Sequence, residues 1–380
     1  MIKRTLQELC LNITDGKHGD CENEENSGYY FISCKDIFDG QINYKNARQI
    51  TKADFEETHK RTMLEVDDIL LTNSGTIGRM AFVTDREATT KTTFQKSVAI
   101  IKPDKQKVLP RYLYYQLQNC VPQFINSSNG SAQKNLLLST MRTFQIEIEE
   151  NREKQEKIAN TLSAYDDLIE NNQRQIKLLE EAAQRLYKEW FVDLRFPGHE
   201  NTKIVDGVPE GWSRTNINEI LTFHRGYDLT KNEMKAGRYP VVGSTTVIGY
   251  HNEFKIKGPG IVTGRSGSLG KYQFIWDNFW PHNTSLYISD YKDHNIFFVY
   301  SLLQTVDFAS LNNGGAIPTL NRNVLSNIEV IEPTDELQEM FAKIAEPQYQ
   351  KIKNLEKQND KLKTARDLLL PKFMSGEVEV

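Results

Sequence analysis

Residues 68–83 read DILLTNSGTIGRMAFV, and residues 260–275 read GIVTGRSGSLGKYQFI. Each stretch has an apolar run, then Ser-Gly-x-x-Gly followed by Arg or Lys, then a second run of residues that favour β-strands. Ser74 and Arg79 of the first copy therefore correspond to Ser266 and Lys271 of the second. Self-similarity over such a distance predicts that the chain contains two copies of one fold.

The flanking segments extend the repeat in the same order. Each copy continues with a strand-like stretch, a helix-like stretch and a strand-like tail. The three pairs are 97–100 and 285–288, 110–117 and 295–303, and 144–146 and 328–330. Strands mixed with helices in each copy predict a mixed α/β (α+β) fold for both globular parts.

After each copy the apolar residues repeat with alternating steps of three and four, which is the heptad pattern of a long paired helix. The first seam includes Ile158, Leu162, Tyr165, Ile169, Asn172, Ile176, Leu179 and Leu186. The second seam includes Ile352, Leu355, Asn359, Leu362 and Leu369. A buried Asn172 would cost stability but can fix the register of the pair. Pro347 should end or kink the second helix near Glu346, because proline lacks a donor and clashes with the preceding turn.

These patterns predict four segments: a globular domain at 1–150, a helical spacer at 151–195, a second globular domain at 196–333 and a second helical spacer at 334–380. Pro and Gly in 196–200 and 207–212 indicate a linker, and Pro371 and Gly376 should mark the end of the last helix. We expect the two helices to pack as an antiparallel coiled coil. At about 1.5 Å per residue a helix over 152–191 is roughly 60 Å long, and one turn of B-DNA spans about 34–36 Å. The helices could hold two DNA-reading heads apart, or they could simply staple two domains together.

Composition narrows the class of protein. The 380 residues carry a net charge of −4 and no segment is strongly basic, so any DNA affinity must come from a local face or from partners. No apolar run approaches the length of a membrane span, and the first residues lack the apolar core of a secretory signal. The four cysteines form no CxxC pair and are typical of reduced thiols, so we expect a cytoplasmic protein without a membrane segment.

Motifs of enzyme chemistry are absent from the sequence. Tyr272 follows Lys271 where a phosphate-binding loop needs Ser or Thr. The seven histidines form no HExxH, no GxSxG elbow occurs, and the absence of Pro-Pro excludes the Asp/Asn-Pro-Pro-Tyr motif of amino-methyltransferases. We therefore expect neither a catalytic nor a metal site. The Gly-rich repeats could be tight hairpins whose glycines accept positive φ, or hairpins whose polar side chains contact DNA.

Polar residues gather where strands and turns should meet, and their side chains are those that bind phosphates or base edges. Each of them could equally lie in an ordinary solvated loop. The candidates of the first copy are Lys17, His18, Thr76, Arg79, Lys91, Gln133 and Lys134. The candidates of the second copy are Arg225, Tyr227, Ser244, Arg265, Ser268, Lys271, Asn283 and Arg322.

Several stretches, taken with the duplicated plan, resemble the specificity (S) subunit of type I restriction–modification enzymes over the whole chain. They are TDGKHG at 14–19 followed by YFISCKDI at 30–37, GSAQKNL at 130–136, the helix entry QEKIA at 155–159 running to LLE at 178–180, and the ending LLLPKFMSGEV at 368–378. The second copy departs from the first, because GAIPTL at 315–320 replaces SAQKNL at 131–136. The two heads should therefore contact DNA differently.

The resemblance implies a non-catalytic subunit with two target recognition domains. Each domain reads half of a split, asymmetric sequence in double-stranded DNA, and the antiparallel helices set the unread spacer. Two methyltransferase subunits dock on the subunit and modify adenine with S-adenosylmethionine. Restriction/translocase subunits, which need ATP and magnesium, join through the methyltransferase. No cofactor is expected on this chain. The residues alone leave two alternatives open: a self-contained DNA methyltransferase or nuclease, and a coiled-coil scaffold that does not bind DNA.

Overall fold

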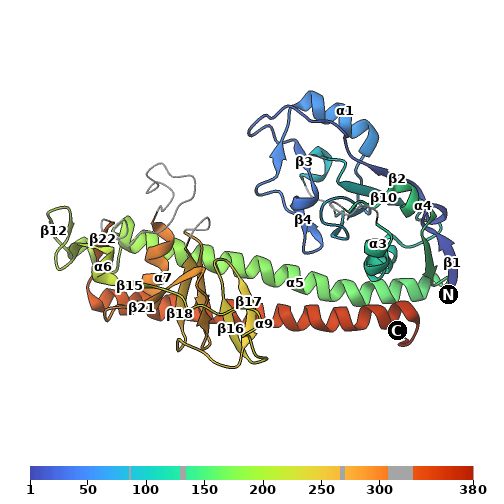
Figure 1. Ribbon diagram of the computed structural model, residues 1–380. Helices are drawn as coiled ribbons and strands as arrows, with labels where there is room; N and C mark the ends of the chain where they lie inside the picture. Colours follow the sequence, from blue (N-terminus) through green and yellow to red (C-terminus); the bar gives the residue numbers. More distant parts are fainter. Residues whose placement is uncertain (85–86, 129–133, 266–269, 307–327, 380) are drawn as a thin grey trace. The chain divides into compact units, whose positions relative to one another are not determined.

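The computed structural model describes residues 1–84, 87–128, 134–265, 270–306 and 328–379. Contacts within the chain divide it into two units. The first unit combines Met1–Glu170 with Asn359–Val380, and the second unit is Asn171–Gln358. Both are mixtures of strands and helices, drawn from blue to teal and from yellow to orange in Figure 1. The predicted mixed α/β fold is therefore confirmed.

The first unit contains a four-stranded antiparallel sheet in the order β2-β10-β7-β8 and a three-stranded sheet in the order β6-β3-β9. In the smaller sheet β3 pairs antiparallel with β6 and parallel with β9. A third pair, β1 with β11, joins the first residues to the end of the globular part. The bounds are β1 Ile2–Thr5, β2 Cys10–Asp15, β3 Tyr30–Ile32, β6 Arg48–Gln49, β7 Ile69–Thr72, β8 Met80–Phe82, β9 Thr92–Phe94, β10 Val98–Pro103 and β11 Gln145–Ile148, with a small hairpin of β4 Ile37–Phe38 and β5 Gln41–Ile42.

The second unit repeats the four-stranded sheet, the three-stranded sheet and the pair of outer strands in the same order. Its four-stranded sheet runs β15-β21-β18-β19, and its three-stranded sheet runs β17-β16-β20 with one antiparallel and one parallel pair. Strands β14 and β22 pair as β1 and β11 do. The bounds are β14 Ser213–Asn216, β15 Thr222–Arg225, β16 Tyr239–Val242, β17 Val247–His251, β18 Gly260–Gly264, β19 Tyr272–Ile275, β20 Trp280–Pro281, β21 Ser285–Asp290 and β22 Glu329–Glu332. The repeat in the sequence is thus a repeat in the fold.

The repeated Gly motif lies in the hairpin between the two strands that flank it. Strand β7 is fully buried, and its turn to β8 places Gly75 and Gly78 at φ of 78° and 92°. Gly270, which corresponds to Gly78, also has a positive φ of 79°. Residues with a Cβ rarely adopt this conformation, so the motif is explained by the turn. Ser266, Gly267 and Ser268 lie outside the described residues.

Short helices cover the sheets of both units. In the first unit they are α1 Lys52–Thr62, α2 Pro110–Asn119, α3 Val121–Asn126 and α4 Leu138–Thr143; in the second they are α6 Ile217–Ile220 and α7 Ile296–Thr305. Thr51 directly precedes helix α1 and caps it, because its side chain accepts a hydrogen bond from the Asp54 backbone amide. In the second unit, described residues 252–259 join β17 to β18 without a helix, so α1 is a feature of the first unit.

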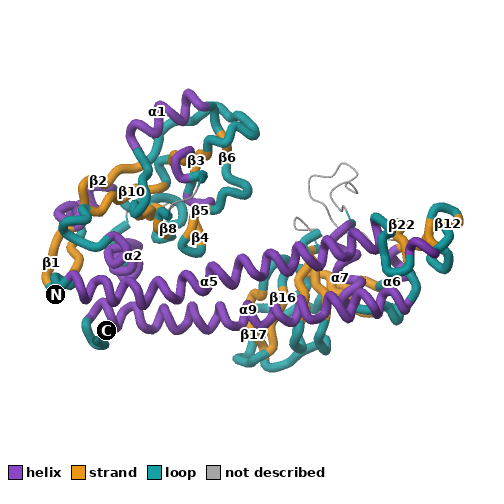
Figure 2. Tube along the Cα trace, turned by 180° about the vertical axis from the view of Figure 1, so that it is seen from behind, coloured by secondary structure: helices purple, strands orange, loops and turns teal. Residues whose placement is uncertain are grey.

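Two long helices, α5 Arg152–Tyr187 and α9 Asp335–Ser375, each contribute to both units. In the first unit, Leu162 of α5 shares a core with Phe373 of α9. In the second unit, Tyr187 of α5 shares a core with Phe341 of α9 and with α7. Figure 2 shows α5 and α9 side by side in this unit. Polar contacts also join the helices. Arg366 contacts Asp166 at 2.6 Å, and the side-chain amide of Asn172 donates to the side-chain oxygen of Gln358 at 3.2 Å. In the first unit the beginning of α5 packs against the end of α9, and in the second unit the end of α5 packs against the beginning of α9.

Every residue of the predicted heptad seams is buried or half-buried. The buried members are Ile158, Leu162, Ile169, Asn172, Ile352, Leu355 and Asn359, and the half-buried members are Tyr165, Ile176, Leu179, Leu186, Leu362 and Leu369. The period read from the sequence therefore identifies the covered face of both helices.

Two local predictions are wrong. Pro347 does not end the helix near Glu346, because α9 continues through Pro347 and also through Pro371 to Ser375. A kink at Pro347, the other expected outcome, stays a prediction. A proline inside a helix costs roughly 3 kcal/mol, and burial of Ala345, Tyr349 and Ile352 around Pro347 offsets this cost. The stretch expected to be a linker is also part of the fold: Phe196, Val208 and Trp212 are buried in the core of the second unit, and β12 Ile204–Val205 pairs with β13 Val208–Pro209. Gly376 follows the last helix with φ of 73°, as predicted for a helix end.

A buried ion pair in the first unit should titrate unusually. The Asp68 carboxylate, at the start of β7, accepts hydrogen bonds from Lys102 Nζ at 2.7 Å and from the Glu65 amide at 2.8 Å. Burial nevertheless raises the pKa of Asp68 to about 6, while Lys102 lowers it. A pKa raised in the folded state means that this group's contribution to stability is present below about pH 4 and is lost as the pH rises through about 6.

Carbon-13 NMR of aspartate-labelled protein should therefore find one carboxyl that titrates near pH 6. The substitution Lys102→Met should raise the pKa of Asp68 further, because it removes the nearest positive charge. Lys105 pairs with Asp67 instead, so Lys105→Met is the matched control and should leave the Asp68 titration unchanged. An Asp68 carboxyl that titrates near pH 4 in the wild type would contradict this account.

Among the described residues, no helix combines the length and the apolar character that crossing a membrane would require.

Candidate nucleic-acid interface

In each unit the two larger sheets meet at one end, where polar residues follow the strands. In the first unit, the chain leaving β2 passes the end of β9: Lys17 bridges to Gln95, and its amide donates to the Phe94 carbonyl at 2.8 Å. In the second unit, Tyr227 bridges to His282, and its amide donates to the Pro281 carbonyl at 2.8 Å. We call the residues at this place the strand-end cluster. They are 15–18, 33–34, 73–74 and 95–97 in the first unit and 225–228, 243–244, 264–265 and 282–284 in the second.

The strand registers make these residues equivalent position by position. Asp15 lies opposite Ala99 on β10, and Arg225 lies opposite Leu286 on β21, at the same step of the ladder. The same comparison pairs residues that the sequence repeat did not align. The resulting equivalences are Asp15 with Arg225, Lys17 with Tyr227, His18 with Asp228, Cys34 with Ser244, Asn73 with Arg265, Arg79 with Lys271, and Gln95, Lys96 and Ser97 with His282, Asn283 and Thr284.

A glycine allows the chain to approach at this point in both units. A Cβ on Gly16 would lie 1.9 Å from the Phe94 carbonyl oxygen, and one on Gly226 would lie 2.1 Å from the His282 carbonyl oxygen. Real Cβ atoms do not approach backbone oxygens so closely, so only glycine fits. The two glycines hold the end of β2 or β15 against the neighbouring sheet and so fix the position of the cluster.

The predicted residues of the first unit differ in their availability. Lys17 is engaged, because its Nζ pairs with Asp54 at 2.9 Å and with Glu57 at 3.2 Å on α1, and the Asp54 hydrogen bond raises its pKa. His18 is exposed, with its Nε2 2.9 Å from the buried Asp15 carboxylate. Lys17 therefore ties α1 to the cluster, whereas His18 is presented to solvent.

The remaining candidates of the first unit that the structure describes are exposed, but not all of them lie at the cluster. Thr76 and Arg79 lie in the β7–β8 turn, and the Arg79 amide donates to Thr72 Oγ1 at 2.9 Å. Lys134 is next to Asn135, which bridges to Ser74. Lys91 lies before β9, at the end of that strand opposite to Gln95, so the structure does not bring it to the cluster. Gln133 lies outside the described residues.

In the second unit most of the predicted residues lie together. Ser244 Oγ donates to the Thr284 carbonyl at 2.8 Å, and Asn283 donates to Asp228. The Tyr227 and Tyr287 hydroxyls are 3.0 Å apart. Arg225 and Arg265 belong to the same cluster, at the ends of β15 and β18, whereas Lys271 directly precedes β19. Ser268 and Arg322 lie outside the part of the chain that the structure describes.

Sequence reasoning missed residues that the structure places at the cluster. Asn73 is equivalent to Arg265, and Lys96 is equivalent to Asn283, yet only the second-unit members were chosen. The repeated Gly motif gives the first equivalence directly, since Asn73 precedes Ser74 as Arg265 precedes Ser266. Arg61 of α1 contacts Asp15, and no pattern in the sequence predicted this contact.

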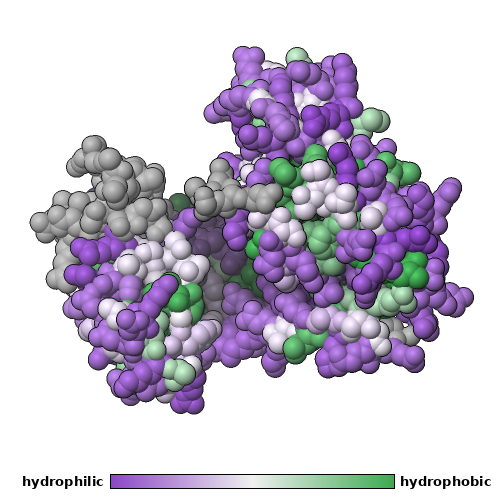
Figure 3. Space-filling model, turned by 45° about the vertical axis from the view of Figure 1, so that its right-hand side comes forward, coloured by the Kyte–Doolittle hydropathy of each residue, from purple (hydrophilic) through white to green (hydrophobic). Residues whose placement is uncertain are grey.

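The chemistry of the cluster suits hydrogen bonding to a polar polymer. It combines guanidinium, ammonium, amide, imidazole and hydroxyl groups, which together can bind phosphates and base edges. Figure 3 shows a face on which hydrophilic residues predominate and hydrophobic ones are scattered. In the described part of the chain, no group of three or more His, Cys, Asp and Glu side chains is placed to hold a metal ion.

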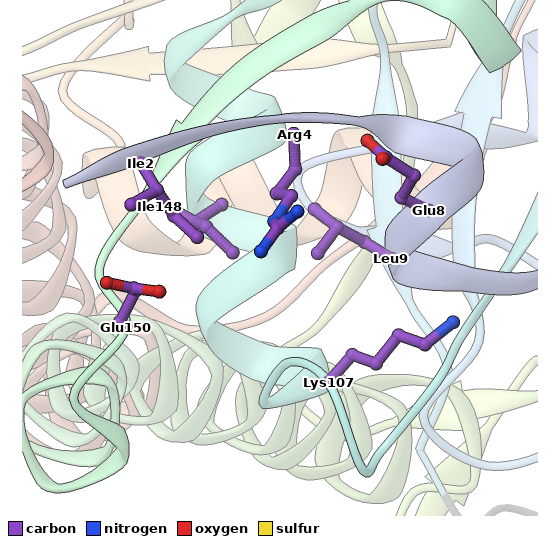
Figure 4. Close-up of a pocket in the computed structure, with 7 residues that line it drawn as sticks. All are labelled: Ile2, Arg4, Glu8, Leu9, Lys107, Ile148 and Glu150. Carbon is purple, nitrogen blue, oxygen red and sulfur yellow. The ribbon is translucent and has the colours of Figure 1, made fainter.

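An open pocket of the first unit lies elsewhere, between β1, β11 and the chain before α2 (Figure 4). Arg4 points between Ile148 and Leu9, with Lys107, Glu8 and Glu150 around it. All four charged side chains are exposed and their charges balance. Hydrogen bonds from the Thr5 amide and hydroxyl lower the pKa of Glu8. The pocket contains none of the predicted site residues.

A family model described as Type I restriction modification DNA specificity domain matches residues 3–181 and 209–364, which together make up most of the chain. The chain belongs to this family. The resemblance seen in the sequence is thereby confirmed. Type I specificity subunits determine DNA sequence specificity and are the non-catalytic components of their enzymes, so the chain is a specificity subunit rather than a nuclease or a methyltransferase.

Similar specificity subunits are known from several organisms. The Type I restriction enzyme MjaIX specificity subunit of Methanocaldococcus jannaschii is 27% identical over 384 residues, which cover 92% of this chain and 87% of that protein. The EcoBI specificity subunit of Escherichia coli is 28% identical over 173 residues, 44% of this chain and 35% of that protein. The crystal structure of the type I S subunit from M. genitalium has a TM-score of 0.60 and 20% identity, covering 98% of this chain and 95% of that one. This last likeness shows a shared fold.

Proposed function

We propose that the chain selects a split, asymmetric target in double-stranded DNA, with the strand-end cluster of each unit contacting one half. The observation that carries the proposal is the repeated cluster. The two units place hydrogen-bonding side chains at equivalent strand ends, yet the side chains differ at almost every position, as in Asn73 and Arg265. A duplicated fold with different polar side chains at one place suits two readers of different sequences.

The long helices would act as the spacer of this reader. Their seams are covered along both units, which supports an antiparallel coiled coil that sets the number of unread base pairs. Two methyltransferase subunits would dock on the specificity subunit and use S-adenosylmethionine to modify adenine. Restriction/translocase subunits, with ATP and magnesium, would join through them. Partners that also bind phosphates would compensate for the net charge of −4.

Methylome sequencing of a host with and without this chain tests the proposal. We expect a split motif with methylated adenines that appears only when the chain and its methyltransferase are both expressed. The purified chain alone should neither transfer methyl groups nor cleave DNA. Methylation that persists without the chain, or a motif without an unread gap, would refute the proposal.

The assignment of one half of the target to each unit has its own test. The substitution Arg265→Ala, in the second cluster, should relax the base preference in one half of the methylated motif and leave the other half intact. The matched control is Arg214→Ala, because Arg214 is exposed in the same unit but lies on β14 and pairs with Glu329 at 3.2 Å. Changes in both halves of the motif would contradict the assignment.

A further inference from the structure

A buried carboxylate at the end of β2 contacts two exposed side chains, an imidazole and a guanidinium. The side chain of Asp15 is 8% exposed, whereas those of His18 and Arg61 are 61% and 51% exposed. One carboxylate oxygen lies 2.9 Å from His18 Nε2, and the other accepts a hydrogen bond from Arg61 Nη2. Arg61 Nε also donates to Thr14 Oγ1 at 3.4 Å. The guanidinium is thus held through Nε and Nη2, while half of the side chain is exposed to solvent.

The second unit also has an arginine next to a carboxylate at this place, but the acidic and basic residues occupy exchanged positions. Arg225 occupies the position of Asp15, and Asp228 occupies the position of His18. Arg225 Nη2 lies 3.7 Å from Asp228 Oδ1, and its side chain is 51% exposed. Each unit therefore has a half-exposed guanidinium next to a carboxylate beside this strand end. In the first unit the guanidinium comes from α1, for which the described residues of the second unit offer no equivalent helix.

Stability alone does not account for this arrangement. Exposed ion pairs contribute little to folding, and the second unit has no buried carboxylate at this position that would need a partner, because Asp228 is 79% exposed. What the two units share is the presented guanidinium, supplied by different elements. A guanidinium has five N–H donors in a rigid fork, and Asp15 and Thr14 engage two of them through Nη2 and Nε. The rest can bind a ligand with paired acceptors.

We propose that Arg61 is a DNA-contacting residue of the first unit, positioned by Asp15, and that it is the counterpart of Arg225 in the second. The inference rests on the proposed function. Its ligand is a pair of acceptor oxygens or nitrogens on the duplex, as found on the guanine edge and on phosphate. Arg61 was absent from the residues that the sequence identified, because α1 breaks the repeat.

The test uses the full chain co-purified with its methyltransferase subunit and a duplex library with a randomised central segment. Bound duplexes are sequenced, and the affinity for the selected duplex is measured at two salt concentrations. Arg61→Ala should weaken binding by about 5- to 150-fold. Arg61→Lys keeps the charge but loses the fork, so it should recover only part of the affinity. Lys60→Ala, which removes an exposed charge from the neighbouring position of α1, is the matched control and should bind as the wild type does.

The pattern of the loss tells the two ligands apart, and either pattern supports the proposal. Loss of preference at one base position, in the half that Arg225→Ala leaves unchanged, identifies a guanine edge. Uniform weakening with a smaller salt dependence identifies a phosphate. Thermal melting checks that each variant is folded. If Arg61→Ala is not folded, the result for Arg61→Lys decides the test. Folded Arg61 variants that bind as tightly as Lys60→Ala would overturn the proposal. A wild-type complex with no sequence preference would refute the proposed function itself.

Discussion

Replacing Phe341 by alanine is expected to lower the free energy of unfolding of the second unit by about 3–5 kcal/mol. Phe341 is completely buried where α9 meets α5, and its ring lies 5.4 Å from that of Phe191 and 5.8 Å from that of Tyr187. Removing it leaves a cavity among aromatic rings that are held by two helices and cannot collapse freely. The loss should therefore be near the upper end for a core residue.

Tryptophan fluorescence during denaturant unfolding measures this effect selectively. All four tryptophans, Trp190, Trp212, Trp276 and Trp280, belong to the second unit. The matched control is Met340→Ala on the adjacent, 41% exposed position of the same helix, which should cost less than about 1 kcal/mol. Equal midpoints for the two variants would show that the aromatic cluster does not hold the helices in this unit.

The second large effect is expected for Gly16→Ala in the first unit. The new Cβ would meet the Phe94 carbonyl at 1.9 Å, so the backbone must move and the Lys17 amide must lose its 2.8 Å hydrogen bond. We expect a loss of roughly 2–4 kcal/mol in the first unit. Because Asp15 precedes Gly16 and His18 follows two residues later, the half of the DNA target that we propose for the first unit should also lose its recognition.

Hydrogen exchange at the amides of β2 and β9 reports the change, while tryptophan fluorescence of the second unit should stay constant. Gly19→Ala provides the control, because a Cβ there would meet only the end of the Lys17 side chain at 3.9 Å. If Gly16→Ala is as stable as Gly19→Ala, the close approach of the two sheets is not required for the fold.

The sequence predicted the parts of the fold that depend on local pattern and on the repeat. The two copies of the Gly motif aligned β7–β8 with β18–β19, and the heptad period identified the covered face of α5 and α9. The Gly motif reflects the conformation of a turn and the heptad reflects periodic burial, and each of these signals is contained in a single segment. The family resemblance depended on other local stretches, such as 14–19, 130–136 and 368–378, and the family model confirmed it.

Contacts between distant segments were not predictable in this way. Lys17 was a candidate for DNA contact, but Asp54 and Glu57 of α1 neutralise it, and nothing near residue 17 signals this. Arg61 was missed for the same reason. At Pro347 a local signal was present but misleading. The rule that proline ends a helix was outweighed by the burial of the neighbouring residues. Individual site residues depend on which side chains the tertiary fold brings together, and for these the strand registers were decisive.

The division of the chain has a consequence for its synthesis. The first unit is discontinuous, since Asn359–Val380 complete a core that Met1–Glu170 begin. A ribosome therefore finishes the whole of the second unit before it releases the piece that the first unit still lacks. A premature stop codon after Gln358 would therefore leave the second unit complete and truncate the first unit, although the first unit is encoded mainly at the beginning of the message.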